Sequence, residues 1–515
     1  MGGKSEYKNG CSSTTTRIAK NTIFLYFRQI LIMLVSLYTV RVVLNVLGAE
    51  DYGIYNVVAG VVTMFSFLSG AMASASQRYF SFDLGKGDIE HLKITFNITF
   101  EIYLLLAILI VILAETFGLY FVHKKLVIPQ ERMMAAKWIY QLSIFSLLMS
   151  LITTPYMAII IAHEKMSVYA YVSIIEVSLK VGIVFLLKVL PYDKLIVYGI
   201  LLAVVSFINT SIYRFYCYKN YSECKFLFVK DKKLFKELIS YSSWNLFGSV
   251  ASMVRNQGLT ILLNLFFGPL INASRAVAMQ VNVAVLSFAQ NFSTALRPQI
   301  IKSYAVNEKE RTIKLVLYGT KIVFFLMAVI CVPLFFQVPY LLKLWLKNVP
   351  DYTVIFVQLV IIDVLIDSIS YPIMSVVQAT GKIKLYQSVV GGCLILNLPA
   401  SYIFLKVGFP PETVFVVAII FSFIALILRV VISQRLLLCN LILPFTKLIL
   451  LFLGLTILSC IIPLFLINKL NENFLEFCLF VIISVVWSGL ILFLFGLNKE
   501  EKKLVLNNLT WRKNE

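Results

Sequence analysis

The chain has 515 residues, of which 60% are hydrophobic and only 14% are charged, and its mean hydropathy is +0.87. Soluble domains are about 45–50% apolar and about 25% charged, so this composition excludes a soluble enzyme, a disordered regulator and a nucleic-acid-binding domain. The 46 Lys and Arg outnumber the 26 Asp and Glu and give a formal charge of +20. In so apolar a chain, that excess predicts cations gathered in loops on one side of a membrane.

Apolar runs predict fourteen membrane-spanning helices, because one span needs about 20 residues. In chain order they cover residues 21–46, 52–80, 94–121, 133–161, 167–189, 195–216, 238–267, 270–296, 312–337, 352–377, 383–406, 412–437, 445–467 and 474–496. The first run is longer than the apolar core of a signal peptide and has no cleavage site after it, so it is expected to remain as a span. The expected fold is an all-α polytopic membrane protein.

Most Lys and Arg fall in segments on one side of these spans. The segments are the 217–237 connection, residues 297–314 and the C-terminal tail, whereas the connections on the other side are short. Cytoplasmic loops carry an excess of cations, so both termini are expected to be cytoplasmic and the basic loops to lie beside membrane lipids.

The two halves of the chain resemble each other at an offset of 219 residues. Asn45 and Asn264 lie near the ends of the first and seventh spans, and Arg78 and Arg297 end the second and eighth. An offset of six spans preserves orientation, which is the parallel-repeat arrangement of some transporters. The predicted domains are a cytoplasmic tail (1–20), a six-helix bundle (21–216), a cytoplasmic basic linker (217–237), a second six-helix bundle (238–437), two additional C-terminal helices (438–496) and a cytoplasmic tail (497–515).

Three arginines lie away from the ends of predicted spans and are candidates for function: Arg28 in the first, Arg255 in the seventh and Arg275 in the eighth. A charge at bilayer depth is costly, so each is either paired with a neighbouring carboxylate or helix end, or functional. Asparagines lie on helical stripes of the second, seventh and eighth spans: Asn56, Asn256 and Asn282. Tight packing through small residues is one explanation of such stripes. A water-filled cavity between the first, second, seventh and eighth spans explains the arginines and asparagines together.

Five further ionisable residues lie inside predicted spans and are candidates for carrying a coupling proton or cation: Asp363, Asp367, Glu176, Lys180 and Glu101. Alternatives remain for each. Glu176 and Lys180 are four residues apart in the order that favours an intrahelical ion pair, and the two aspartates could pair with an arginine of another span. Arg41 and Arg429 lie closer to span ends, where snorkelling is expected.

Neither a metal site nor a catalytic constellation is predicted. The eight Cys form no CxxC pair and mostly lie in apolar runs, and the three His are scattered. Buried cysteines behave as small apolar residues. We therefore expect no cofactor and no enzymatic activity.

The N-terminal region resembles a known family. Residues 37–44 (LYTVRVVL), 47–58 (LGAEDYGIYNVV) and 77–80 (QRYF) are similar to those of bacterial flippases of the Wzx (O-antigen translocase) type. These belong to the multidrug/oligosaccharidyl-lipid/polysaccharide (MOP) exporter superfamily, which includes the multidrug and toxin exporters called MATE.

The resemblance implies a fold and a function. It implies two MATE-like six-helix bundles around a cavity lined by spans 1, 2, 7 and 8. It also implies alternating-access export of a polyprenyl-pyrophosphate-linked oligosaccharide across the bacterial inner membrane, beside other polysaccharide-assembly proteins. Arg28, Arg255 and Arg275 would hold the pyrophosphate, and the last two spans could hold the polyprenyl tail.

Two other functions remain open on the sequence. One is a multidrug exporter of the same fold, coupled to protons or sodium. That branch often has a carboxylate in the first span, whereas residues 18–48 contain neither Asp nor Glu. The other is a membrane polysaccharide polymerase or ligase, which needs a large outward loop that this chain lacks.

Overall fold

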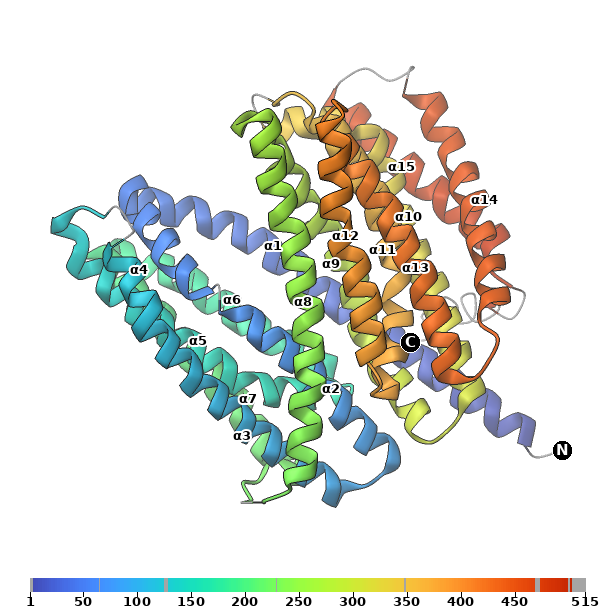
Figure 1. Ribbon diagram of the computed structural model, residues 1–515, viewed down its shortest axis with the longest axis horizontal. Helices are drawn as coiled ribbons and strands as arrows, with labels where there is room; N and C mark the ends of the chain where they lie inside the picture. The colour runs from blue at the N-terminus through green and yellow to red at the C-terminus, as the bar shows by residue number, and fades with distance from the viewer. Residues whose placement is uncertain are drawn as a thin grey trace. The chain divides into compact units, whose positions relative to one another are not determined.

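The computed structural model describes residues 3–63, 65–124, 128–227, 229–346, 349–467, 473–498 and 501–502, and in these ranges all regular structure is helical (Figure 1). The elements are α1 (Gly3–Thr63), α2 (Ser66–Lys86), α3 (Ile89–Leu113), the π-helical turn η1 (Ala114–Gly118), α4 (Leu119–Lys124), the 3-10 turn η2 (Gln130–Arg132), α5 (Met133–Ala162), α6 (Met166–Val189), α7 (Lys194–Asn220), the 3-10 turn η3 (Ser222–Cys224), α8 (Lys232–Phe267), α9 (Pro269–Ala305), α10 (Lys309–Trp345), α11 (Thr353–Thr380), α12 (Lys384–Lys406), α13 (Thr413–Leu437), α14 (Ile442–Leu466), α15 (Phe474–Ile491) and the π-helical turn η4 (Leu492–Gly496).

The predicted spans coincide with these helices, which confirms the all-α polytopic fold. Among the described residues, ten helices are long and apolar enough to cross a membrane, and Glu50–Thr63 with Leu68–Lys86 forms a bent eleventh candidate. Helices α8 and α9, and the part of α1 before Glu50, lie outside this set. The residues predicted to be a polar tail are helical from Gly3 onward.

The helices form two compact units. The N-terminal unit comprises Ala19–Ser249 and Ile301–Asn307, and the C-terminal unit comprises Met1–Ile18, Val250–Ile300 and Glu308–Glu515. The connection at 217–237, which the sequence suggests as a linker, lies inside the N-terminal unit. Because α8 continues unbroken from Lys232 to Phe267, the chain passes from one unit to the other in mid-helix.

Corresponding glycines break the chain in the two halves of the repeat. Gly48 interrupts α1 with φ at 82°, and Gly268 separates α8 from α9 with φ at 80°. Residues with a Cβ adopt this left-handed region only at a cost, so glycine lets one helix follow another after a single residue. Both breaks lie at the sequence repeat, and they support its prediction.

Aromatic side chains form much of the core of the N-terminal unit, where α5 packs against α2, α3 and α7. The rings of Phe80 and Tyr156 flank that of Phe96, with centroids 5.8 and 5.5 Å away. In a separate apolar cluster of the same unit, the Tyr140 hydroxyl donates to the carbonyl of Ala114 at 2.5 Å, where η1 widens the helix. A Cβ on Gly118 would collide with that hydroxyl, which explains glycine at this position.

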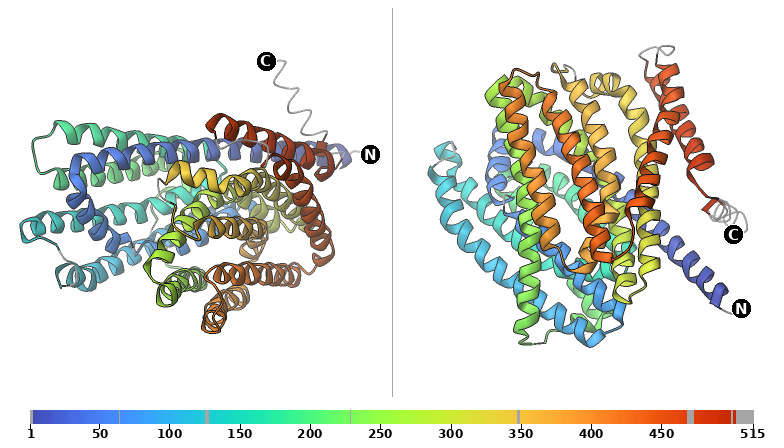
Figure 2. Two further views of the ribbon diagram at one scale, coloured as in Figure 1. Left: turned by 90° about the horizontal axis from the view of Figure 1, so that it is seen from above. Right: turned by 45° about the vertical axis from the view of Figure 1, so that its right-hand side comes forward.

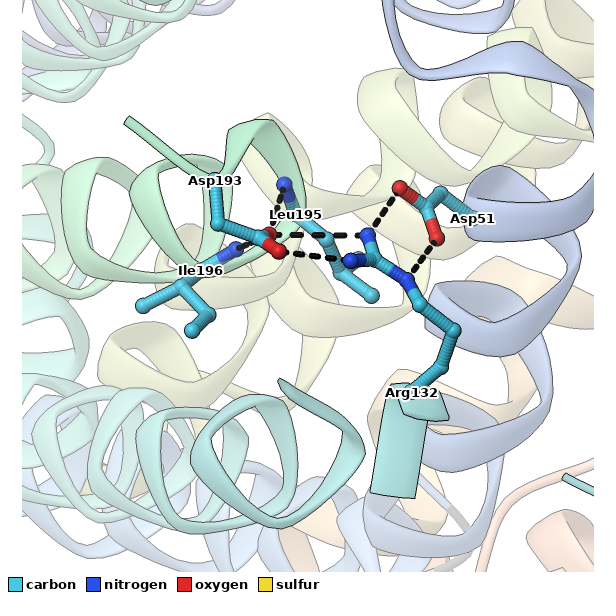
Figure 3. Close-up of polar contacts among 5 residues, drawn as sticks. All are labelled: Asp51, Arg132, Asp193, Leu195 and Ile196. Atoms are coloured by element: carbon cyan, nitrogen blue, oxygen red, sulfur yellow. Dashed lines mark hydrogen bonds and ion pairs between the residues drawn. The ribbon is translucent and has the colours of Figure 1, made fainter. Parts of the chain in front are cut away.

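A charged cluster ties three segments of the same unit together (Figure 3). Arg132, at the end of η2, pairs with Asp51 of α1 and donates to Asp193 Oδ2 at 2.6 Å. Asp193 also caps α7 by accepting from the backbone N–H groups of Leu195 and Ile196 at 3.0 and 3.2 Å. Burial alone would raise the pKa of Asp193, but the hydrogen bonds from Ile196 and Arg132 outweigh it and lower the pKa.

The last turn of α9 is anchored in the N-terminal unit. Lys302 Nζ donates to Glu164 Oε1 at 2.7 Å, and the Glu164 side chain is only 2% exposed. The end of α2 approaches closely because it carries glycine: a Cβ on Gly85 would lie 2.7 Å from Lys302 Cα and 2.9 Å from Ala305 Cβ. The absence of a side chain at position 85 therefore permits this contact.

In the C-terminal unit, α11 packs between α10 and α13, and α12 packs against α13 (Figure 1). The two C-terminal helices, α14 and α15, pack on α10 (red beside yellow in Figure 2). The ring of Phe324 stacks on that of Phe452 at 4.0 Å, and Lys321 Nζ donates to Glu501 Oε2 at 2.5 Å. The helices that lie outside the repeat are thus held by both apolar and charged contacts.

Replacing Gly85 with alanine should destabilise the N-terminal unit. The added methyl group would overlap the backbone of α9, and overpacking of this kind costs about 1–3 kcal/mol. Gly70→Ala, on the same helix, is the matched control, because a Cβ there meets nothing within 4 Å. Thermal unfolding of the purified protein should show a lower midpoint for Gly85→Ala only; equal midpoints for both variants would contradict the close approach.

Candidate functional site

Arg275 joins the two helices that begin the C-terminal unit. It lies in the second turn of α9, its side chain is buried, and its guanidinium reaches α8. Its Nε donates to Thr260 Oγ1 at 3.1 Å, and its Nη2 donates to the carbonyl of Asn256 at 3.0 Å. Asn256, a predicted site residue, thus contacts this arginine through its backbone.

Arg255 lies on the same segment of α8 and carries a second positive charge. Its Nε is buried and has no hydrogen-bond partner in the described part of the chain. It lies near enough to Arg275 and to Asp363 of α11 to interact electrostatically with both. Like charges repel each other, so an additional anion beside Arg255 and Arg275 would be stabilised by both.

The two predicted aspartates of α11 have different surroundings. Asp367 Oδ1 lies 3.6 Å from Arg429 Nη1 of α13. Asp363 Oδ1 is buried and has no hydrogen-bond partner among the described residues. Asp363 interacts electrostatically with Asp367, Arg255 and Arg429. Together with Arg275, which interacts with Arg255, these residues form a cluster of three arginines and two aspartates.

The expectation that Arg429 snorkels to the membrane surface is wrong. Its side chain is 6% exposed and lies inside the C-terminal unit. Arg429 Nη1 donates to Ser370 Oγ at 2.7 Å, and Nε donates to the Tyr386 hydroxyl at 3.3 Å. Neighbouring helices α11 and α12 cover it, which distance from a span end does not reveal. The same expectation for Arg41 is not tested, because the side chain of Arg41 lies outside the described part of the chain.

Arg28 lies in the N-terminal unit, on α1, and faces α6. Its guanidinium carbon is 4.3 Å from the centroid of the Tyr169 ring, and its Nη1 donates to Ser173 Oγ at 3.5 Å. A cation over an aromatic face is stabilised by the electron-rich ring, so Tyr169 helps to hold the guanidinium of Arg28 in place.

The other candidates of the N-terminal unit have local partners. Lys180 Nζ donates to Glu176 Oε1 at 2.7 Å, which is the expected intrahelical pair, and Asn209 Nδ2 donates to Glu176 Oε2 at 3.2 Å. Asn56 is exposed and donates to the carbonyl of Tyr52 at 2.8 Å. Glu101 is exposed on α3.

The geometry therefore brings together some of the predicted residues and leaves others apart. Arg255, Arg275, Asp363 and Asp367 form one cluster in the C-terminal unit, and Asn282 is half-buried on α9. Arg28 belongs to the other unit. A common cavity lined by the first, second, seventh and eighth spans remains a prediction, since these spans divide between the two units.

A metal centre finds no support in the side chains that the structure describes. They include no group of three or more His, Cys, Asp and Glu that could hold an ion. What the C-terminal cluster offers instead is two adjacent guanidinium groups, which bind phosphate or carboxylate oxygens.

Comparison with known proteins identifies the family. The model of a family described as polysaccharide biosynthesis proteins matches residues 18–306. The chain belongs to this family. This match confirms the resemblance noted in the sequence. A separate search of curated proteins finds no match.

Solved structures show which fold this family member has. An outward-facing multidrug resistance MATE family transporter of the MOP superfamily has a TM-score of 0.73 at 12% identity, with 83% of this chain and 96% of that chain covered. A MOP superfamily transporter from Pyrococcus furiosus has a TM-score of 0.69 at 12% identity, with the same coverage. A MATE protein in complex with MaD3S has a TM-score of 0.71 at 11% identity, again covering 83% and 96%. This family member has the MATE-like fold.

Arg255 and Arg429 should respond oppositely to neutral substitution. Arg429→Gln leaves Asp367 without its cation, and breaking a buried pair costs about 3–5 kcal/mol. Arg255→Gln removes a charge that has no hydrogen-bonded partner on Nε, so stability should be kept or raised. Thermal unfolding of both purified variants measures this, and a fall for Arg255→Gln as large as that for Arg429→Gln would show that Arg255 is structural.

Proposed function

We propose that this protein is a flippase that moves polyprenyl-pyrophosphate-linked oligosaccharides, the repeat units of O-antigen, capsule or exopolysaccharide, across the cytoplasmic membrane. Membership of the polysaccharide biosynthesis family and the MATE-like fold support the general class. The excess of cations in the 217–237 connection and the tails supports a location with both termini in the cytoplasm.

One observation carries the choice of substrate. The charges of Arg255 and Arg275 interact with each other, and neither arginine forms an ion pair with a carboxylate within 4.0 Å in the described part of the chain. Arginine presents a planar fork of donors that matches phosphate oxygens. A pyrophosphate would neutralise both charges and occupy the donors that the helices leave unused.

Arg28 would extend the same recognition to the N-terminal unit. The aromatic face of Tyr169 and the Ser173 hydroxyl orient its guanidinium. We propose that Arg28 also binds an anionic group of the substrate, and that Asn56, Asn256 and Asn282 contact the glycan.

Asp363 is the carboxylate best placed to couple transport to a proton or cation. Its Oδ1 has no hydrogen-bond partner among the described residues, and it interacts electrostatically with Arg255. A charged Asp363 would partly neutralise Arg255, and a neutralised Asp363 would leave Arg255 to the substrate. Asp367 and Glu176 are less suited to this role because Arg429 and Lys180 already pair with them.

A cation-coupled multidrug exporter is the second candidate. Its support is the similarity to a multidrug resistance MATE family transporter, together with the carboxylates of α11. Organic cations would be repelled by the adjacent charges of Arg255 and Arg275, which favours the anionic substrate. Resistance to organic cations on expression, without any effect on surface glycan, would favour the exporter.

Removing either arginine of the pair should abolish glycan export. Each charge-assisted hydrogen bond to phosphate contributes about 1.5–3 kcal/mol, so Arg255→Ala and Arg275→Ala should each weaken substrate binding at least about tenfold. Surface glycan in a strain that lacks the native gene measures export when membrane abundance is matched.

The matched control for this experiment is Arg311→Ala. Arg311 belongs to the same unit, is half-exposed and pairs with Glu308 on its own helix at 2.9 Å. This variant should export normally. Normal export by both Arg255→Ala and Arg275→Ala would refute the assigned role of these residues.

A further inference from the structure

A small pocket opens in the N-terminal unit, and none of the arginines assigned to the substrate lines it. It has a volume of about 140 Å³ and is lined by α3, α5, the last turns of α7 and the segment that follows η3. The lining residues are Phe96, Asn97, Phe100, Tyr156, Arg214, Tyr218, Cys224 and Phe226. Most of its wall is aromatic.

The pocket is held open by hydrogen bonds to Asn97 of α3. The Asn97 side chain donates to the carbonyl of Lys225 at 3.2 Å and accepts from the backbone N–H of Leu227 at 2.8 Å. The ring centroid of Tyr156 lies 5.5 and 5.9 Å from those of Phe96 and Phe100. The rim segment and the aromatic wall are therefore fixed to the helices before any ligand binds.

One cation faces this apolar wall. Arg214 of α7 interacts electrostatically with the Tyr156 hydroxyl group and forms no ion pair in the described part of the chain. It is exposed, so its donors are accessible from outside the protein. A guanidinium beside a phenol and aromatic rings offers a site for a phosphate that carries an apolar group.

The surroundings are those of a membrane interface. Phe215, Tyr218 and Phe226 are 70%, 62% and 74% exposed around the end of α7, and Lys219 and Lys225 are exposed beside them. Exposed aromatic side chains mark the headgroup level of membrane proteins, and clustered cations there attract anionic lipids.

The size of the pocket restricts the ligand. One water molecule occupies about 30 Å³ of liquid, so about 140 Å³ accommodates a phosphate group or a few methylenes. It is too small for an oligosaccharide or a nucleotide. The rest of the ligand must lie outside the pocket, as an acyl chain would against the exposed rings.

We propose that this pocket binds an anionic phospholipid, with its phosphate on Arg214 and the Tyr156 hydroxyl and its acyl chain along the exposed aromatic side chains. Such a lipid would contact α3, α5 and α7 at once and stabilise their packing. None of the residues assigned to the transported substrate lines this pocket.

Lipid titrations of the purified full-length protein in detergent test this proposal. Phosphatidylglycerol, phosphatidylcholine and inorganic phosphate are each added, and the midpoint of thermal unfolding is followed. Phosphatidylglycerol should raise the midpoint of the wild type, while phosphatidylcholine and inorganic phosphate should have much smaller effects. In Arg214→Gln the apparent dissociation constant of phosphatidylglycerol should rise at least about tenfold.

Lys219→Gln is the matched control, since Lys219 is exposed near the same helix end but does not line the pocket. It should keep the response to phosphatidylglycerol, and Tyr156→Phe should weaken it. Three results would overturn the proposal: an unchanged response in Arg214→Gln, an equal response to phosphatidylcholine, or an equal response to inorganic phosphate. The last would indicate a site for soluble phosphate.

Discussion

A charge inside a membrane is costly unless something compensates it. Three arginines of the C-terminal unit, Arg429, Arg275 and Arg255, differ in the partners that compensate their charges. Arg429 has a carboxylate near it and two hydroxyl partners, so its charge is neutralised within the protein. Arg275 donates to a backbone carbonyl and to a hydroxyl group, neither of which neutralises its charge. Arg255 keeps a buried nitrogen without a partner among the described residues.

These different partners distinguish an arginine that stabilises the fold from arginines that could bind a ligand. The pair of Arg429 and Asp367 holds α13 to α11, and it needs no ligand. The adjacent charges of Arg255 and Arg275 are a cost to the folded protein, and such costs are retained where binding requires them. An anionic substrate would offset this repulsion, and the hydrogen bonds of Arg275 already orient its guanidinium.

The parts of this account that are visible in the sequence are those in which a local pattern carries the signal. A long apolar run predicts a helix, and Arg255 or Arg275 inside such a run stands out from its neighbours. Gly48 and Gly268 mark the repeat because only glycine readily adopts the backbone that each break requires. Glu176 and Lys180 pair along one helix, so their spacing was sufficient to suggest the contact.

Contacts between segments that are far apart in the chain cannot be predicted from a local sequence pattern. Arg132 lies 81 residues from Asp51 and 61 from Asp193, and only the position of Asp193 before an apolar run hints at its role as a cap. The position of Arg429 near a span end predicts that it reaches the membrane surface, because the sequence does not show that α11 and α12 cover it. The pocket beside Arg214 likewise depends on Asn97, which joins segments about 130 residues apart.

The most direct test of the central claim is the binding of farnesyl pyrophosphate, a short-chain probe, to the purified protein and to a variant carrying Arg255→Gln and Arg275→Gln. Calorimetric titration in detergent at two salt concentrations gives both affinities. We expect binding by the unmodified protein that weakens as salt rises, and an affinity at least about tenfold lower in the double variant. Equal affinities for the two proteins would contradict the claim that these arginines bind the pyrophosphate.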